Sequence, residues 1–124
     1  AVEYPGSAAG AQAVWLELTG ARFAAELAPA RTFCLEREYQ ALLASGLAKG
    51  GGAENAFVVK EDGYSGELRF PDEVVRHKAL DLVGDLSLCG FRFVGQVIAV
   101  RPSHHLNVRL ASALRERRSA GSRK

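Results

Sequence analysis

The sequence predicts an α+β fold: a two-layer sandwich in which a mixed or antiparallel sheet carries two main helices on one face, with a small strand–helix–strand insert. Two observations predict it. Several short segments have the apolar alternation or β-branched composition of strands. Two longer segments open with helix-capping residues. Grouped strands and helices, instead of strict alternation, favour helices covering one face of a sheet.

The first thirty residues contain two expected strands and a helix, over Val2–Tyr4, Ala13–Leu18 and Ala21–Leu27. The second strand places apolar residues at alternate positions. Thr19 can cap the helix that follows, and Pro29 ends it.

The expected insert occupies about residues 31–59. Arg31–Leu35 is a short extended piece, Glu36–Ala44 has helical composition with Gly46 as a stop signal, and Ala56–Val59 reads as a strand. Extended segments on both sides of the helix predict a unit that projects from the main sheet.

The second half contains two expected strands and the two main helices. The strands are Glu67–Phe70 and Phe91–Val100. Proline and carboxylates at Pro71-Asp72-Glu73 open a helix that runs through Leu86. Ser103 caps a closing helix over His104–Arg115.

The composition is that of one soluble globular domain. The chain has 124 residues, 48% of them apolar and 24% charged. It contains no apolar run of the roughly 18–20 residues that span a bilayer and no secretory signal, so we expect a cytoplasmic protein. The two cysteines, Cys34 and Cys89, are expected to be packed, reduced thiols.

The positive charge is concentrated at the end of the chain. Residues 115–124 carry five cations and one anion, a net charge of +4, which leaves −2 for the rest of the chain. We expect residues 117–124 to form a flexible basic tail. Because the body has no basic stripe with aromatic residues between the cations, we expect no nucleic-acid partner.

One expected helix carries possible metal ligands. His77, Asp81 and Asp85 recur every four residues and therefore lie along one stripe. A histidine and a carboxylate at this spacing can bind one metal ion, although a salt-bridged solvated face has the same pattern. His104, at the end of a strand, could be a general acid, a ligand, or a helix residue without a special role.

Five groups of residues, in order, resemble a known family. They are Ala30-Arg31-Thr32-Phe33; Gly46-Leu47 with Gly50-Gly51; Leu68-Arg69-Phe70; Arg76-His77-Lys78-Ala79-Leu80-Asp81 with Gly84-Asp85-Leu86; and His104 with Leu106-Asn107. Together they resemble the C-terminal domain of the zinc-dependent UDP-3-O-acyl-N-acetylglucosamine deacetylases of lipid A synthesis. The resemblance assigns residues 1–116 to that domain.

The resemblance implies a role for each polar residue of the stripe. His77 and Asp81 would be two of three Zn²⁺ ligands, and the metal would polarise the amide carbonyl and activate water. Lys78 would help to position the substrate. His104 would be the protonated general acid, oriented and kept charged by Asp85.

The resemblance also implies substrate contacts. Thr32 would hydrogen-bond the oxyanion of the tetrahedral intermediate, and Phe33 would lie against the sugar, although it could equally be core. The insert would form a hydrophobic passage for the fatty acyl chain. Its lining would include Tyr39, Ala48, Ala53, Ala56 and Val58, which could instead simply pack the insert together.

Two departures from the family pattern matter. Ser103 stands where the family has glycine, so the backbone of this loop could differ. The family's third zinc ligand and its glutamate base belong to an N-terminal domain that this chain does not contain. We therefore expect a zinc amidase half that deacetylates a UDP-sugar acyl substrate only with that domain as its partner.

Two other functions stay open at this level. The same fold could be a non-catalytic module that binds a lipid-like ligand or a partner protein. The basic tail could also bind nucleic acid, in which case binding would depend on salt and on residues 119–124.

Overall fold

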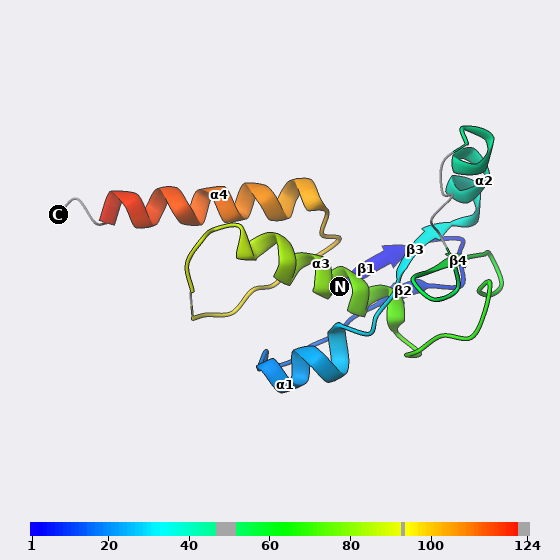
Figure 1. The fold of residues 1–124 in the computed structure, drawn as a ribbon, viewed down its shortest axis with the longest axis horizontal. Helices are drawn as coiled ribbons and strands as arrows, with labels where there is room; N and C mark the ends of the chain where they lie inside the picture. Colours follow the sequence, from blue (N-terminus) through cyan, green and yellow to red (C-terminus); the bar gives the residue numbers. More distant parts are fainter. Residues whose placement is uncertain (47–51, 93, 122–124) are drawn as a thin grey trace.

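The computed structural model describes residues 1–46, 52–92 and 94–121. The elements follow the order β1, β2, α1, η1, β3, α2, β4, α3, α4. The chain has an α+β fold, as predicted. It is elongated, with α4 (His104–Gly121) at one end, α2 (Glu36–Ala44) at the other, and α3 (Glu73–Ser87) between them (Figure 1).

The strands form two small sheets. β1 (Val2–Tyr4) pairs antiparallel with β2 (Gly10–Gln12), and β3 (Thr32–Leu35) pairs parallel with β4 (Ala56–Val59). The prediction of a single mixed or antiparallel sheet was therefore wrong, because no ladder joins the two pairs within the described residues.

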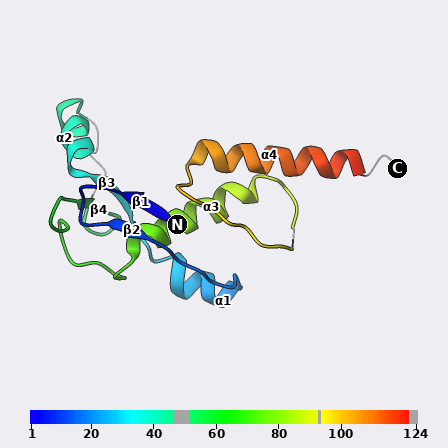
Figure 2. The same cartoon turned by 180° about the vertical axis from the view of Figure 1, so that it is seen from behind.

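The predicted strand–helix–strand insert is confirmed as β3–α2–β4. The carboxylate of Glu38 accepts a hydrogen bond from the backbone N–H of Leu35 at 3.1 Å and so satisfies a donor at the start of α2. Gly46, with φ of +71°, follows the end of the helix in the left-handed conformation that glycine adopts without strain. The helix projects away from the rest of the chain in both views (Figures 1 and 2).

Two clusters of buried side chains hold the chain together, and α3 contributes to both. The larger cluster joins the sheets to the start of α3 through Val2, Ala9, Phe57, Val59, Val74 and Val75. The smaller one joins the end of α3 to α4 through Leu86, Cys89 and Ala111. Thus α3 is the element that fixes the sheets relative to α4.

The helix predicted over Ala21–Leu27 is present in two parts. α1 spans Gly20–Arg22, and its first turn is capped by the Thr19 hydroxyl, which accepts from the N–H of Arg22 at 3.2 Å. η1 (Phe23–Leu27) continues it as a π-helical turn, in which the N–H of Ala28 donates to the carbonyl of Phe23.

The closing helix begins as predicted and extends further. The Ser103 hydroxyl accepts from the N–H of Leu106 at 3.3 Å, an N-terminal capping bond. α4 continues to Gly121, six residues beyond the predicted end at Arg115. Residues 117–121 of the expected tail are therefore helical, and residues 122–124 lie outside the described part of the chain.

Three predicted strands are absent from the described residues: Ala13–Leu18, Glu67–Phe70 and Phe91–Val100. In the first and third, a strand would bury apolar side chains, but Leu18, Val94 and Ile98 are 52%, 97% and 79% exposed. Without a layer over these side chains, apolar composition is not sufficient to form a ladder. Near its end the third segment does contact the residue before β1, since the ammonium group of Ala1 donates to the carbonyl of Ala99 at 2.7 Å.

The remaining absent strand has a different cause. Within Glu67–Phe70, the N–H of Arg69 donates to the side chain of Glu73 instead of to a neighbouring strand.

In the part of the chain that the structure describes, no helix is both long and apolar enough to cross a bilayer.

Candidate functional site

The site lies on the stripe of α3 that carries His77, Asp81 and Asp85. Successive residues of the stripe are one turn apart, and α4 packs beside the second half of the helix (Figure 1). This packing brings His104, at the first turn of α4, to the two carboxylates. The structure thus brings together four of the residues that the sequence singled out.

His77 is held by a backbone carbonyl. Its Nδ1 lies 3.1 Å from the carbonyl oxygen of Ala30, 47 positions earlier in the chain. Because a carbonyl only accepts, this contact requires the proton of the neutral ring to be on Nδ1. The lone pair is then on Nε2, which lies 3.3 Å from the Oδ1 of Asp81.

This arrangement fits a metal ion. Zinc bonds of about 2.0–2.2 Å to nitrogen and oxygen, at tetrahedral angles, place adjacent ligand atoms about 3.4 Å apart. The separation of 3.3 Å between His77 Nε2 and Asp81 Oδ1 agrees with that value. A histidine whose other nitrogen is bonded to a carbonyl is also the usual ligand arrangement. No group of three or more potential ligands occurs among the described residues.

The second oxygen of Asp81 faces the side chains of Lys78 and His104. Oδ2 lies 3.3 Å from the ammonium nitrogen of Lys78 and 3.8 Å from the Nε2 of His104. The side chain of Asp81 is 15% exposed, whereas that of His104 is 66% exposed. The imidazole therefore stands at the open side of the site, where a substrate can approach.

Asp85 orients His104 and is itself held in place. Its Oδ2 lies 2.7 Å from the Nδ1 of His104 and accepts a hydrogen bond from the Nδ2 of Asn107 at 3.0 Å. Asn107 is buried, one turn after His104 on α4. The sequence alone assigns no role to Asn107, although a position three residues after His104 on a helix places it on the same face.

Aromatic rings form the wall beside His77. The ring of Phe33 lies edge-on to His77 with centroids 6.2 Å apart, and the ammonium of Lys78 lies 5.8 Å from the Phe33 centroid. Phe33 also packs against the larger core cluster and against Tyr4. Burial raises the pKa of Tyr4, and the negative charges of Glu38 and Asp81 raise it further. This wall therefore supplies a neutral phenol and an apolar surface next to the charged stripe.

Thr32 is the first residue of β3, with an exposed side chain. Its backbone N–H donates to the carbonyl of Asn55 at 3.2 Å. Among the described contacts, none joins the Thr32 hydroxyl to the His77–Asp81 pair. Its assignment as an oxyanion donor stays a prediction.

The expected acyl-passage residues divide among three places. Ala56 and Val58 share one face of β4, opposite the buried face that carries Phe57 and Val59. Tyr39 lies half-buried in α2, and Ala53 is exposed in the turn before β4. Ala48 lies outside the described residues.

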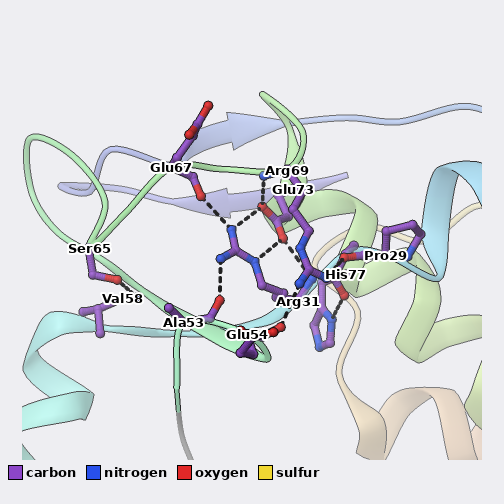
Figure 3. A network of polar contacts seen from close by, with 11 residues as sticks. Pro29, Arg31, Ala53, Glu54, Val58, Ser65, Glu67, Arg69, Glu73 and His77 are labelled. Atoms are coloured by element: carbon purple, nitrogen blue, oxygen red, sulfur yellow. Dashed lines mark hydrogen bonds and ion pairs between the residues drawn. The ribbon is translucent and has the colours of Figure 1, made fainter.

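Two further features of the site could not be predicted from the sequence, because they depend on contacts between residues that are far apart in the chain. One is the carbonyl of Ala30, which carries no signal in the side-chain sequence. The other is a buried ion pair between Arg31 and Glu73, beside the site (Figure 3). From the sequence, Glu73 is expected only as a carboxylate that opens the helix.

Comparison with known proteins identifies a family and several related sequences. The family model described as UDP-3-O-acyl N-acetylglycosamine deacetylase matches residues 1–116. The proteins named UDP-3-O-acyl-N-acetylglucosamine deacetylase from Chlamydia felis and Thermosynechococcus vestitus are 50% and 43% identical over 101 and 118 residues. These alignments cover 80% and 94% of this chain but 36% and 41% of the relatives.

A third relative with that name, from Chlamydia trachomatis, is 46% identical over 112 residues, which are 89% of this chain and 39% of the relative. The chain thus spans about two fifths of the length of the curated relatives it matches. The family match extends over nearly all of this sequence and includes His77, Asp81, Asp85 and His104. The chain belongs to the UDP-3-O-acyl N-acetylglycosamine deacetylase family.

Proposed function

We propose that this chain supplies one half of the active site of a zinc-dependent amide hydrolase. The reaction removes acetate from a UDP-3-O-acyl-N-acetylglucosamine in lipid A biosynthesis. The observation that carries the proposal is the grouping of His77, Asp81, Asp85 and His104 on two packed helices. The names of the curated relatives supply the substrate class.

His77 and Asp81 would hold the zinc ion through Nε2 and Oδ1. When bound, the ion supplies Lewis-acid chemistry, polarising a carbonyl and activating water. The third ligand and the general base would come from the part of the family's length that this chain does not span, the N-terminal domain of the deacetylase. That domain would be the partner of this chain.

His104 would act as the general acid. With Nδ1 donating to Asp85, its Nε2 is the atom that can carry a proton to the leaving amine. The carboxylate stabilises positive charge on the ring, and Asn107 keeps the carboxylate in place. The exposure of the imidazole lets its Nε2 reach a substrate in the open side of the site.

The remaining residues would bind the substrate. Lys78 would neutralise negative charge beside Asp81, Phe33 would pack against the sugar, and Thr32 would donate to the oxyanion. The face of β4 with Ala56 and Val58 would contact the acyl chain, together with Tyr39, Ala48 and Ala53. We further propose that the protein acts in the cytoplasm, where the free thiols of Cys34 and Cys89 are stable.

The test compares the chain alone with the chain mixed with a separately produced N-terminal domain of a relative. We expect weak zinc binding and no useful turnover from the chain alone, and deacetylation of UDP-3-O-acyl-N-acetylglucosamine by the mixture. Robust turnover by the chain alone would overturn the requirement for a partner. A folded chain with no zinc affinity, alone or in the mixture, would favour a non-catalytic binding module.

A further inference from the structure

Beside the site, a carboxylate and a guanidinium are buried together (Figure 3). Glu73, in the first turn of α3, is 0% exposed, and Arg31, just before β3, is 9% exposed. The Oε1 of Glu73 accepts from both the backbone N–H and the Nε of Arg31, each at 2.9 Å. Its Oε2 accepts from the Nη2 of Arg31 at 3.0 Å and from the N–H of Arg69 at 2.7 Å.

The guanidinium of Arg31 reaches two more segments. Its Nη1 donates to the carbonyl of Ala53 at 2.8 Å, and its Nη2 donates to that of Glu67 at 2.9 Å. The planar group also lies over the ring of Phe57, 5.2 Å from its centroid. The pair therefore fixes the start of α3 to three backbone segments through hydrogen bonds: the segment at Arg31, the segment at Ala53, and the segment 67–69.

The position of this pair relative to the site gives it a specific consequence. Arg31 stands between Ala30, whose carbonyl holds Nδ1 of His77, and Thr32, the candidate oxyanion donor. Glu73 lies one turn before His77 on the same stripe of α3. The backbone N–H of Arg31 donates to Glu73 on α3. This bond attaches the segment that contains the Ala30 carbonyl to the same helix that carries His77.

A contribution to the stability of the fold does not by itself explain a buried ion pair at this place. Burying two charges costs desolvation, and apolar residues of similar volume are often as stabilising. Apolar contacts do not fix the relative orientation of two segments, whereas hydrogen bonds do. The two oxygens of Glu73 accept four hydrogen bonds, which fix the distance and orientation between α3 and the segments at Arg31 and Arg69.

We propose that the Arg31–Glu73 pair is a positioning device for His77: it holds the Ala30 carbonyl against α3, and this carbonyl directs the Nε2 of His77 toward Asp81. Neither charged residue touches the reacting groups. The inference rests on the proposed function in one respect only, that His77 is a metal ligand.

The first test measures the His77 tautomer in the 124-residue chain without metal. Long-range ¹H–¹⁵N spectra at alkaline pH, where histidine is neutral, distinguish a proton on Nδ1 from one on Nε2. We expect the Nδ1–H form in the unaltered chain. In Glu73→Gln, the amide NH₂ faces other donors and part of the network is lost, so we expect a mixture of tautomers.

Arg31→Lys is the second variant, because lysine keeps the charge but cannot make the forked contact. Two controls separate positioning from simple destabilisation. Asp72→Asn removes another ion pair at the start of α3, 2.6 Å long, with Arg76. Val59→Ala removes volume from the core without touching the pair. Both controls should keep the Nδ1–H tautomer even where thermal unfolding shows lower stability.

The second test titrates Co²⁺, a spectroscopic substitute for zinc, into the chain and each variant. Loss of the pair should weaken the affinity by about 10- to 100-fold, the usual effect of removing an outer support of a ligand. Wild-type tautomer and Co²⁺ affinity in both folded variants would overturn the proposal. If the unaltered chain has the Nδ1–H tautomer and loses it in the variants but binds no Co²⁺, positioning holds and the zinc assignment fails.

Discussion

The Nδ1 of His104 lies 2.7 Å from the Oδ2 of Asp85, although the two residues are 19 positions apart and belong to different helices. The contact exists because α3 and α4 pack through Leu86, Cys89 and Ala111. The orientation of the His104 ring, the candidate general acid, therefore depends on how α3 and α4 pack together.

Asp85→Asn should lower kcat of the reconstituted deacetylase by at least about tenfold. The amide cannot stabilise positive charge on His104, and a general acid typically contributes about 10²–10⁴-fold. Steady-state kinetics with the acylated UDP-sugar provide the measurement, and Glu116→Gln, an exposed substitution on α4, is the control. An unchanged kcat in the Asp85 variant would remove this residue from the proposed mechanism.

Asn107→Ala should reduce the free energy of unfolding by about 1–3 kcal/mol, because a buried hydrogen bond to a carboxylate is lost. Urea unfolding measures this change. We also expect lower kcat, since Asp85 loses one of its two partners. Ser112→Ala, at an exposed position of the same helix, should change neither quantity. Lower stability with wild-type kcat would show that Asn107 only supports packing.

His77→Ala and Asp81→Ala should each weaken zinc binding by more than about 100-fold, because each removes a proposed ligand from a site with few ligands. Isothermal titration calorimetry of the chain mixed with the N-terminal domain measures this affinity, because we expect the chain alone to bind zinc only weakly. The matched control is His105→Ala, since His105 is an exposed histidine of α4 that is not one of the proposed ligands. Equal losses in all three variants would indicate nonspecific binding by histidines.

Stability should fall at acidic pH because of Glu73. Burial raises the pKa of this carboxyl, but hydrogen bonds from the Arg31 side chain and from the N–H groups of Arg31 and Arg69, with the Arg31 charge, outweigh burial and leave the pKa below its ordinary 4.5. A carboxyl with a lowered pKa in the folded state stabilises the fold above its unfolded pKa. This contribution is lost as the pH falls below 4.5 and through the folded pKa.

Urea unfolding between about pH 6 and pH 3 tests this prediction, because the window brackets the ordinary carboxyl pKa of 4.5. Glu73→Gln should have a smaller pH dependence than the unaltered chain. The comparison variant is Glu26→Gln: hydrogen bonding to Arg22 lowers the pKa of Glu26, but this side chain is 30% exposed and therefore more screened by solvent than Glu73. An identical pH slope in the Glu73 variant and the unaltered chain would contradict the prediction.

Val58→Phe should raise KM for substrates with long acyl chains. The side chain would enlarge on the face of β4 opposite the core residues Phe57 and Val59, and would narrow the proposed passage. Kinetics with a short-chain and a long-chain substrate measure the difference. An equal change for both chain lengths would show that this face of β4 is not the passage.

The sequence predicted the elements that depend on local signals. The helix over Glu36–Ala44 was predicted with the bounds that the structure has, and the start of α4 follows from Ser103 as its cap. The i, i+4 spacing of His77, Asp81 and Asp85 determined that they share a face, since helix geometry requires it. The motif order determined the family, which the comparisons confirmed.

The long-range pairing was decided only in the tertiary structure. Apolar and β-branched residues predicted a strand over Phe91–Val100, but a strand needs a partner and a covering layer, and Ile98 remains 79% exposed. The contacts that orient the site likewise join residues far apart: Ala30 with His77, and Arg31 with Glu73. A sequence fixes which residues share a helix face, because neighbours in the chain set it; which distant carbonyl or charge meets that face depends on how the whole chain packs.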